Sequence, residues 1–175
     1  EVQLSLTGPD GAPVPRLGPW HRPAAPALRL ALPADRTRYV PLGGKMALLG
    51  IANPPQRAAP GEELALEPVF LALQPLTEDD SVSVGVRWEG GTYEVKSDGT
   101  PALGAIPTLK WLRGWVVGDP HRLAVGTDAP SGQASMTVEV YDAFTLEPLH
   151  VLDERLVREG QGTFVKAGRL DISAP

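Results

Sequence analysis

The chain has 175 residues, among them 19 glycines and 19 prolines, where average usage of the two together is only about 12%. Proline costs a helix interior about 3 kcal/mol and glycine about 1, so this composition excludes a protein built from long helices. With 42% hydrophobic and 21% charged residues, the chain is also unlike a disordered one. The net charge of -5 and the scattered basic residues argue against nucleic acid as a partner.

Apolar and polar residues alternate along most of the chain, which predicts β-strands. The clearest case is residues 81–88, where three valines and Trp88 fall on one face, so we expect Trp88 in the core. Glycine, proline and aspartate separate the segments, as in turns. The predicted strands, in chain order, are 2–7, 28–32, 45–51, 62–73, 81–88, 92–96, 115–117, 121–125, 134–141, 148–152 and 162–172. Residues 153–160 fit a short helix or a polar loop equally well.

This series of short strands predicts an all-β protein, an antiparallel β-sandwich of the immunoglobulin-like or jelly-roll-like kind. We place the main sandwich domain at residues 45–175. Residues 1–44 either add strands to it or are the remnant of a preceding related unit. An Asp-Gly pair, a tryptophan and a His-Arg pair occur twice in the same order, and this weak sequence echo supports the second interpretation. Hairpin turns alone also produce such recurrences. The echoed positions are Asp10-Gly11, Trp20 and His21-Arg22, then Asp98-Gly99, Trp111 and His121-Arg122.

No apolar run approaches the roughly 18 residues of a membrane helix, so we expect no membrane insertion by this segment. The chain begins at Glu1 and enters a strand pattern at once. We therefore expect it to be part of a longer protein.

Several short motifs follow one another in a fixed order. They are Leu48-Leu49-Gly50, Pro60-Gly61-Glu62-Glu63-Leu64, Asp98-Gly99-Thr100-Pro101, Pro107-Thr108-Leu109-Lys110-Trp111, Asp119-Pro120-His121-Arg122-Leu123 and Val138-Glu139-Val140-Tyr141-Asp142. This order resembles a family of accessory β-sandwich domains at the extracytoplasmic, C-terminal end of bacterial multi-span membrane proteins, including glycosyltransferase-like proteins. The chain departs from the family at Trp115, where the family usually has glutamate.

The resemblance implies an extracytoplasmic, non-catalytic accessory or binding module. It also implies carbohydrate, or other domains of a larger membrane protein, as the partner. Two alternatives stay open, namely a structural spacer or self-association domain, and a sandwich hydrolase that uses a pair of carboxylates in a cleft.

Three aromatic residues are the candidate ligand-binding residues: Trp115, Trp111 and Tyr93. Aromatic rings have apolar faces that can stack on a sugar ring, with the polar handle of Trp or Tyr at the edge. The alternative is that these rings anchor the core, because aromatic residues make up only 6% of the chain. Of the two tryptophans, we expect Trp115 to be the more exposed.

Catalytic, metal and cofactor sites are not expected. The serines, Ser97 among them, lie in strands or turns with no histidine suggested beside them, and there is no nucleophile-elbow motif. The three histidines lack the spacing of a zinc site. We expect the main loop acids to be solvated turn residues, with a structural Ca²⁺ as the alternative. These histidines and acids are His21, His121, His150, Glu78, Asp79, Asp80, Asp98, Asp119 and Asp142.

Overall fold

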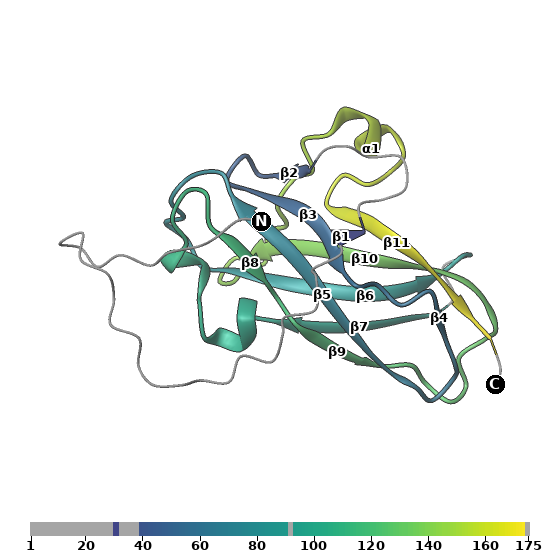
Figure 1. Ribbon diagram of the computed structural model, residues 1–175. Helices are drawn as coiled ribbons and strands as arrows, with labels where there is room; N and C mark the ends of the chain where they lie inside the picture. Colours follow the sequence, from purple (N-terminus) through teal and green to yellow (C-terminus); the bar gives the residue numbers. More distant parts are fainter. Residues whose placement is uncertain (1–29, 32–38, 91–92, 174–175) are drawn as a thin grey trace, which may run out of the picture.

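The computed structural model describes residues 30–31, 39–90 and 93–173. In it the protein is a sandwich of two β-sheets (Figure 1). The six-stranded sheet contains β1 (Leu30–Ala31), β2 (Val40–Leu42), β3 (Met46–Ala52), β5 (Glu63–Ala72), β8 (Val116–Gly118) and β9 (His121–Ala124). The five-stranded sheet contains, in spatial order, β4 (Arg57–Ala58), β11 (Phe164–Ile172), β10 (Gly132–Asp142), β6 (Asp80–Trp88) and β7 (Glu94–Gly99). All strand pairs are antiparallel except β4 with β11. The prediction of an all-β sandwich is confirmed.

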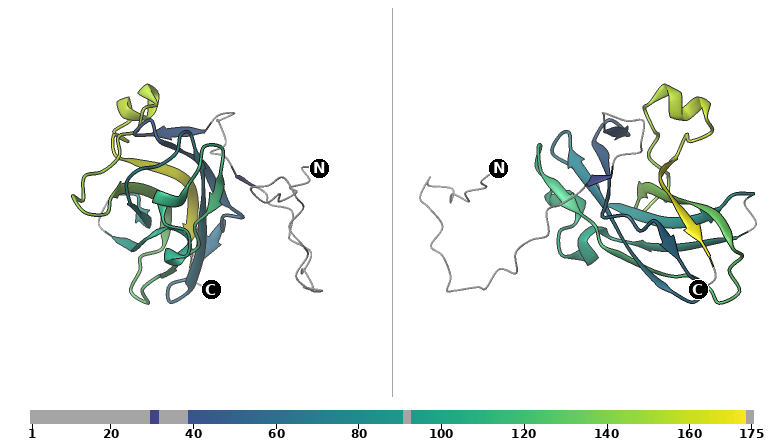
Figure 2. Two further views of the ribbon diagram at one scale, coloured as in Figure 1. Left: turned by 90° about the vertical axis from the view of Figure 1, so that its left-hand side faces the viewer. Right: turned by 45° about the vertical axis from the view of Figure 1, so that its right-hand side comes forward.

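Alternation of apolar residues builds the core between the two sheets. In β6 the valines and Trp88 are buried, and β10 pairs with it in a register that sets Val138 opposite Val84. From the other sheet, Phe70 of β5 is fully buried in the same core. Figure 2 gives two further views of these layers. The prediction that Trp88 belongs to the core is confirmed, since this side chain is 4% exposed.

Two short strands come from the first 44 residues. β1 and β2 both pair with β3, so they extend the same sheet. The predicted strand at residues 2–7 and the first copy of the sequence echo lie outside the described residues.

The segment 148–152 differs from its prediction as a strand. It forms only two isolated bridges, Pro148 to Tyr141 and Val151 to Leu42. Tyr141 belongs to the five-stranded sheet and Leu42 to the other, so the segment crosses between the sheets and pairs along neither. The prediction was wrong because its apolar residues reach both layers.

The region 153–160 contains a short helix, α1 (Glu154–Arg158). Asp153 caps it, because its Oδ1 accepts the N–H groups of Arg155 and Leu156, each at 3.1 Å. Leu156 is buried and fixes the helix against the sandwich, near β2 (Figure 1).

Candidate functional site

Trp111, one of the predicted ligand-binding residues, is a core residue. Its side chain is 1% exposed, its ring lies 6.1 Å from that of Phe70, and its Nε1–H donates to the Ile106 carbonyl at 3.0 Å. Neither face of the ring is open to a ligand. This part of the predicted aromatic site is therefore corrected, and of the two interpretations left open by the sequence, core anchoring applies to Trp111.

Trp115 and Tyr93 do not form a common surface. Trp115 is 42% exposed, and its carbonyl accepts the N–H of Ala72 at the end of β5. The Tyr93 ring packs edge-on against that of Trp88, with the ring centroids 4.8 Å apart, and its hydroxyl donates to Asp128. The loop beside Asp128 is hydrogen-bonded to Gly61, just before β5 begins. β5 has 10 residues, and a strand rises about 3.3 Å per residue, so the two rings lie near opposite ends of a span of about 30 Å.

An open cleft of about 680 Å³ lies where an edge strand of one sheet meets an edge strand of the other. β7 pairs only with β6, and β9 only with β5, among the described residues. The two edge strands lie side by side (Figure 1), and the 3-10 turn η1 (Pro101–Gly104) forms part of the wall. The polar residues that line the cleft are Ser97, Asp98, Thr100, Asp119, His121 and Arg122.

Inside this cleft three side chains are hydrogen-bonded in series. His121 Nε2 lies 2.8 Å from Asp119 Oδ2, and His121 Nδ1 lies 3.1 Å from Ser97 Oγ. A carboxylate only accepts, so Nε2 carries the proton in the neutral ring and Nδ1 accepts the serine hydroxyl. Asp119 and His121 are buried at 1% and 7% exposure, while Ser97 is half-buried. The arrangement orients a serine hydroxyl toward a basic nitrogen at the cleft wall.

Asp119 also holds the η1 turn. Its other oxygen, Oδ1, accepts the N–H of Ala102 at 2.8 Å. Ala102 and Leu103 both have left-handed backbones, with φ of 53° and 57°, a conformation that costs residues with a side chain roughly 1–2 kcal/mol each. Such strain gathers at binding and active sites. The buried carboxylate therefore fixes both the histidine and the strained wall of the cleft.

The expectation that no histidine lies beside the serines was wrong for Ser97. The inward-facing positions of β7 are Val95, Ser97 and Gly99, and His121 shares the inward face of β9 with Leu123. Alternation was thus the available signal for each residue. It could not show that these two faces meet, because β7 and β9 belong to different sheets.

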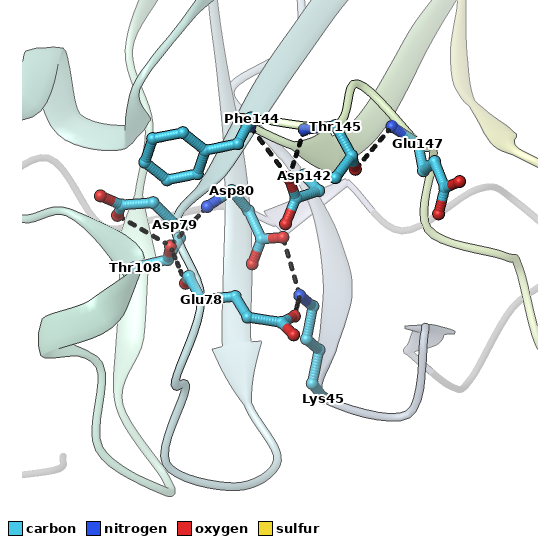
Figure 3. A network of polar contacts seen from close by, with 9 residues as sticks. All are labelled: Lys45, Glu78, Asp79, Asp80, Thr108, Asp142, Phe144, Thr145 and Glu147. Carbon is cyan, nitrogen blue, oxygen red and sulfur yellow. Dashed lines mark hydrogen bonds and ion pairs between the residues drawn. The ribbon is translucent and has the colours of Figure 1, made fainter.

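A second polar network lies at the start of β3 and β6 (Figure 3). Gly43 and Gly44 lie in the tight β2–β3 turn with positive φ, and Lys45 is the last turn residue before β3 begins. The Lys45 Nζ contacts Asp80 Oδ1 and Glu78 Oε2, each at 2.8 Å. Asp80 is completely buried, whereas 61% of the Glu78 side chain is exposed.

Thr108 fixes the backbone of this network. Its Oγ1 accepts the N–H of Asp80 at 2.7 Å and donates to the Glu78 carbonyl at 2.9 Å (Figure 3). Thr108 is itself fully buried, so the start of β6 is held in one position.

Burial sets the acid–base properties of the pair. Desolvation raises the pKa of Asp80, and the contact with Lys45 only partly opposes it. For Lys45, desolvation lowers the pKa, but the hydrogen bonds and charges of Asp80 and Glu78 outweigh it, so the pKa is raised. Asp80 Oδ2 is buried and has no hydrogen-bond partner among the described residues.

The loop acids thus fall into two groups. Asp142 is a turn residue as expected, accepting the N–H groups of Phe144 and Thr145 (Figure 3). Asp80 and Asp119 are buried instead, which corrects their interpretation as solvated turn acids. Within the described ranges, no group of three or more histidine and acidic residues is arranged to hold a metal ion.

Comparisons with known proteins leave the family resemblance as a prediction. No family model matches the chain, and no curated protein matches it. In the described part of the chain, no helix has the length and apolarity to span a bilayer.

Proposed function

We propose that the protein is a non-catalytic, extracytoplasmic accessory module of a larger bacterial protein, and that it binds a hydroxyl-rich ligand of the carbohydrate class in the β7–β9 cleft. The observation that carries the proposal is the cleft itself. Its volume of about 680 Å³ lies within the usual range of ligand sites, about 300–1,000 Å³. The extracytoplasmic location and the carbohydrate class of the ligand rest on the resemblance of the motif order to the family of accessory β-sandwich domains.

The chemistry of the cleft suits hydroxyl groups. The Asp98 carboxylate is exposed and can accept hydrogen bonds. The Arg122 side chain is 77% exposed, and its guanidinium, which contacts Glu63 through one nitrogen, has further N–H groups to donate. The hydroxyl of Thr100 can do both. A ligand with alternating donors and acceptors would therefore find partners on both walls.

The carboxylate-pair hydrolase has less support. Asp119 shares the cleft with Asp98, but both Asp119 oxygens are already engaged, one with Ala102 and one with His121. The other carboxylate, Asp98, accepts the Tyr141 hydroxyl at 3.4 Å through Oδ1, and a glycosidase needs two carboxyl groups with separate roles.

A glycan array tests the proposal, followed by titration of any sugar that binds. We expect Asp98→Ala to weaken binding at least tenfold, because it removes an exposed acceptor from the cleft. Trp115→Ala is the matched control and should leave binding unchanged. Loss of binding in Trp115→Ala alone would mean that the ligand binds at the exposed tryptophan and not in the cleft. Absence of sugar binding by the wild type would refute the proposal.

A second candidate function is acyl transfer by Ser97, favoured by the ordered Ser97–His121–Asp119 contacts. A serine activated by a histidine that a carboxylate orients is the general arrangement for nucleophilic catalysis. We rank it second, because binding needs only the exposed polar groups, while acyl transfer also needs donors for the developing oxyanion.

A fluorophosphonate probe separates the two candidates. Acyl transfer predicts covalent labelling of the wild type at Ser97 and its loss in Ser97→Ala and in His121→Asn. Ser135→Ala, on β10, is the control and should label like the wild type. Absence of labelling in the wild type would eliminate this candidate and leave the binding proposal intact.

A further inference from the structure

The Lys45–Asp80 contact brings an amine and a carboxyl group together inside the protein. Nζ lies 2.8 Å from Oδ1, and a C–O bond adds about 1.2 Å, so Nζ lies within about 4 Å of the carboxyl carbon. Lys45 is 9% exposed and Asp80 is fully buried. The contact also joins the two sheets, since Lys45 directly precedes β3 and Asp80 begins β6.

The two oxygens of Asp80 have different surroundings. Oδ1 accepts from Lys45, whereas Oδ2 is buried without a partner among the described residues. Nearly all buried polar atoms in proteins are hydrogen-bonded, so Oδ2 is an exception that calls for an explanation. A reaction that released Oδ2 as a water molecule would remove this unpartnered buried atom from the protein.

We propose that Lys45 and Asp80 condense to an intramolecular amide bond that cross-links the two sheets. The nitrogen lone pair attacks Cγ of Asp80, a C–N bond forms, and the bond from Cγ to Oδ2 breaks. Starting from an ammonium and a carboxylate, nitrogen gives up two protons, and these leave with Oδ2 as one water molecule. Charge and atoms balance, and no oxidant, reductant or other reactant is required.

Glu78 is placed to move the protons. Its Oε2 lies 2.8 Å from Nζ, on the same nitrogen that contacts Asp80 (Figure 3). The raised pKa of Lys45 makes proton removal the demanding step, which a carboxylate base at this position assists. The raised pKa of Asp80 favours the transfer of one of these protons to its carboxylate, and the neutral acid that results has the more electrophilic carbon. Thr108 prevents the start of β6 from moving away.

High-resolution mass spectrometry of the intact, full-length wild-type chain tests this proposal. We expect a mass lower than the sequence mass by one water molecule. A tryptic digest should contain a branched peptide that joins the Lys45 and Asp80 segments, uncut at Lys45. A wild type with the full sequence mass and no branched peptide, after long incubation at acidic, neutral and alkaline pH, would overturn the proposal.

Three variants examine the mechanism. Lys45→Arg keeps the charge but supplies no nucleophilic amine, so it should retain the full sequence mass. Asp80→Asn should release ammonia in place of water and yield the same cross-link. Glu78→Gln should slow bond formation by about a hundredfold or more, the usual contribution of a general base. A cross-link that forms in Glu78→Gln at the wild-type rate would contradict the role of Glu78.

The exposed pair Lys96–Glu94, at 3.7 Å, is the matched control within the same molecule. It should give no branched peptide, because water has access to it and its geometry is loose. The proposal is independent of the cleft, so sugar binding and cross-linking can succeed or fail separately.

Discussion

Asp142 holds a turn through its side chain. Its Oδ1 accepts the N–H of Thr145 at 2.7 Å and that of Phe144 at 2.9 Å. These two backbone hydrogen bonds, that of Thr145 first, lower the pKa of Asp142 below its ordinary 3.8. An acid whose pKa is lower in the folded state stabilises the fold above its unfolded pKa, and this contribution is lost as the pH falls through the folded value.

We therefore predict that Asp142→Ala lowers the free energy of unfolding at neutral pH and that the deficit shrinks below about pH 4. Urea denaturation of the wild type and the variant over a pH series measures this. Asp142→Asn, which keeps an acceptor oxygen but never ionises, should lose less. A deficit that grows on acidification would contradict the assignment of Asp142 as a turn acceptor in its ionised form.

At the scale of elements, β6 and its neighbours pack so closely that one position requires glycine. A Cβ on Gly85 would lie 2.8 Å from Thr137 Oγ1 and 3.2 Å from the Val95 carbonyl oxygen. Gly85 pairs with Thr137 of β10 on one side and with β7 on the other, so neither strand can move without losing ladder bonds. Gly168 of β11 differs, because its Cβ would meet only the end of the Met136 side chain, at 2.6 Å.

Gly85→Ala should accordingly destabilise the protein by about 1–3 kcal/mol, the usual cost of overpacking. Gly168→Ala is the matched control and should cost less than about 1 kcal/mol, since methionine changes rotamer easily. The midpoints of urea unfolding compare the two. If both variants lost the same free energy of unfolding, the strands beside Gly85 would be able to move apart more easily than their contacts indicate.

At the scale of the whole molecule, one apolar core holds both sheets, and two polar side-chain contacts among the described residues bridge them. The core includes Phe70 and Trp111 from the side of β5 together with the valines of β6 and β10. The bridges are His121 with Ser97 and Lys45 with Asp80. Each bridge joins a residue of the six-stranded side to one of the five-stranded sheet.

The two tryptophans of the predicted ligand site should then behave very differently. We predict that Trp111→Ala destabilises the protein by about 3–5 kcal/mol, as expected when a large core side chain is removed. Trp115→Ala should stay within about 0.5 kcal/mol of the wild type, like most surface substitutions. Thermal and urea unfolding measure both values. A large loss in Trp115→Ala would show that this ring supports the structure despite its exposure.

The sequence by itself determined the class of fold and the buried face of most strands. Alternation is a local property, so it placed Trp88 and the β6 valines in the core correctly. The same local pattern failed at residues 148–152, where apolar residues serve two sheets in turn. Alternation also did not decide whether Trp111 lies in the core or at the surface, because its ring packs against Phe70 only in the folded chain.

Only the tertiary structure decided where polar chemistry gathers. Ser97 and His121 lie 24 positions apart, and Lys45 and Asp80 lie 35 apart. Each pair joins different sheets, and the order and packing of sheets arise from the whole core rather than from neighbouring residues. The cleft and the buried amine–carboxyl contact are consequences of that packing, which no single strand contains.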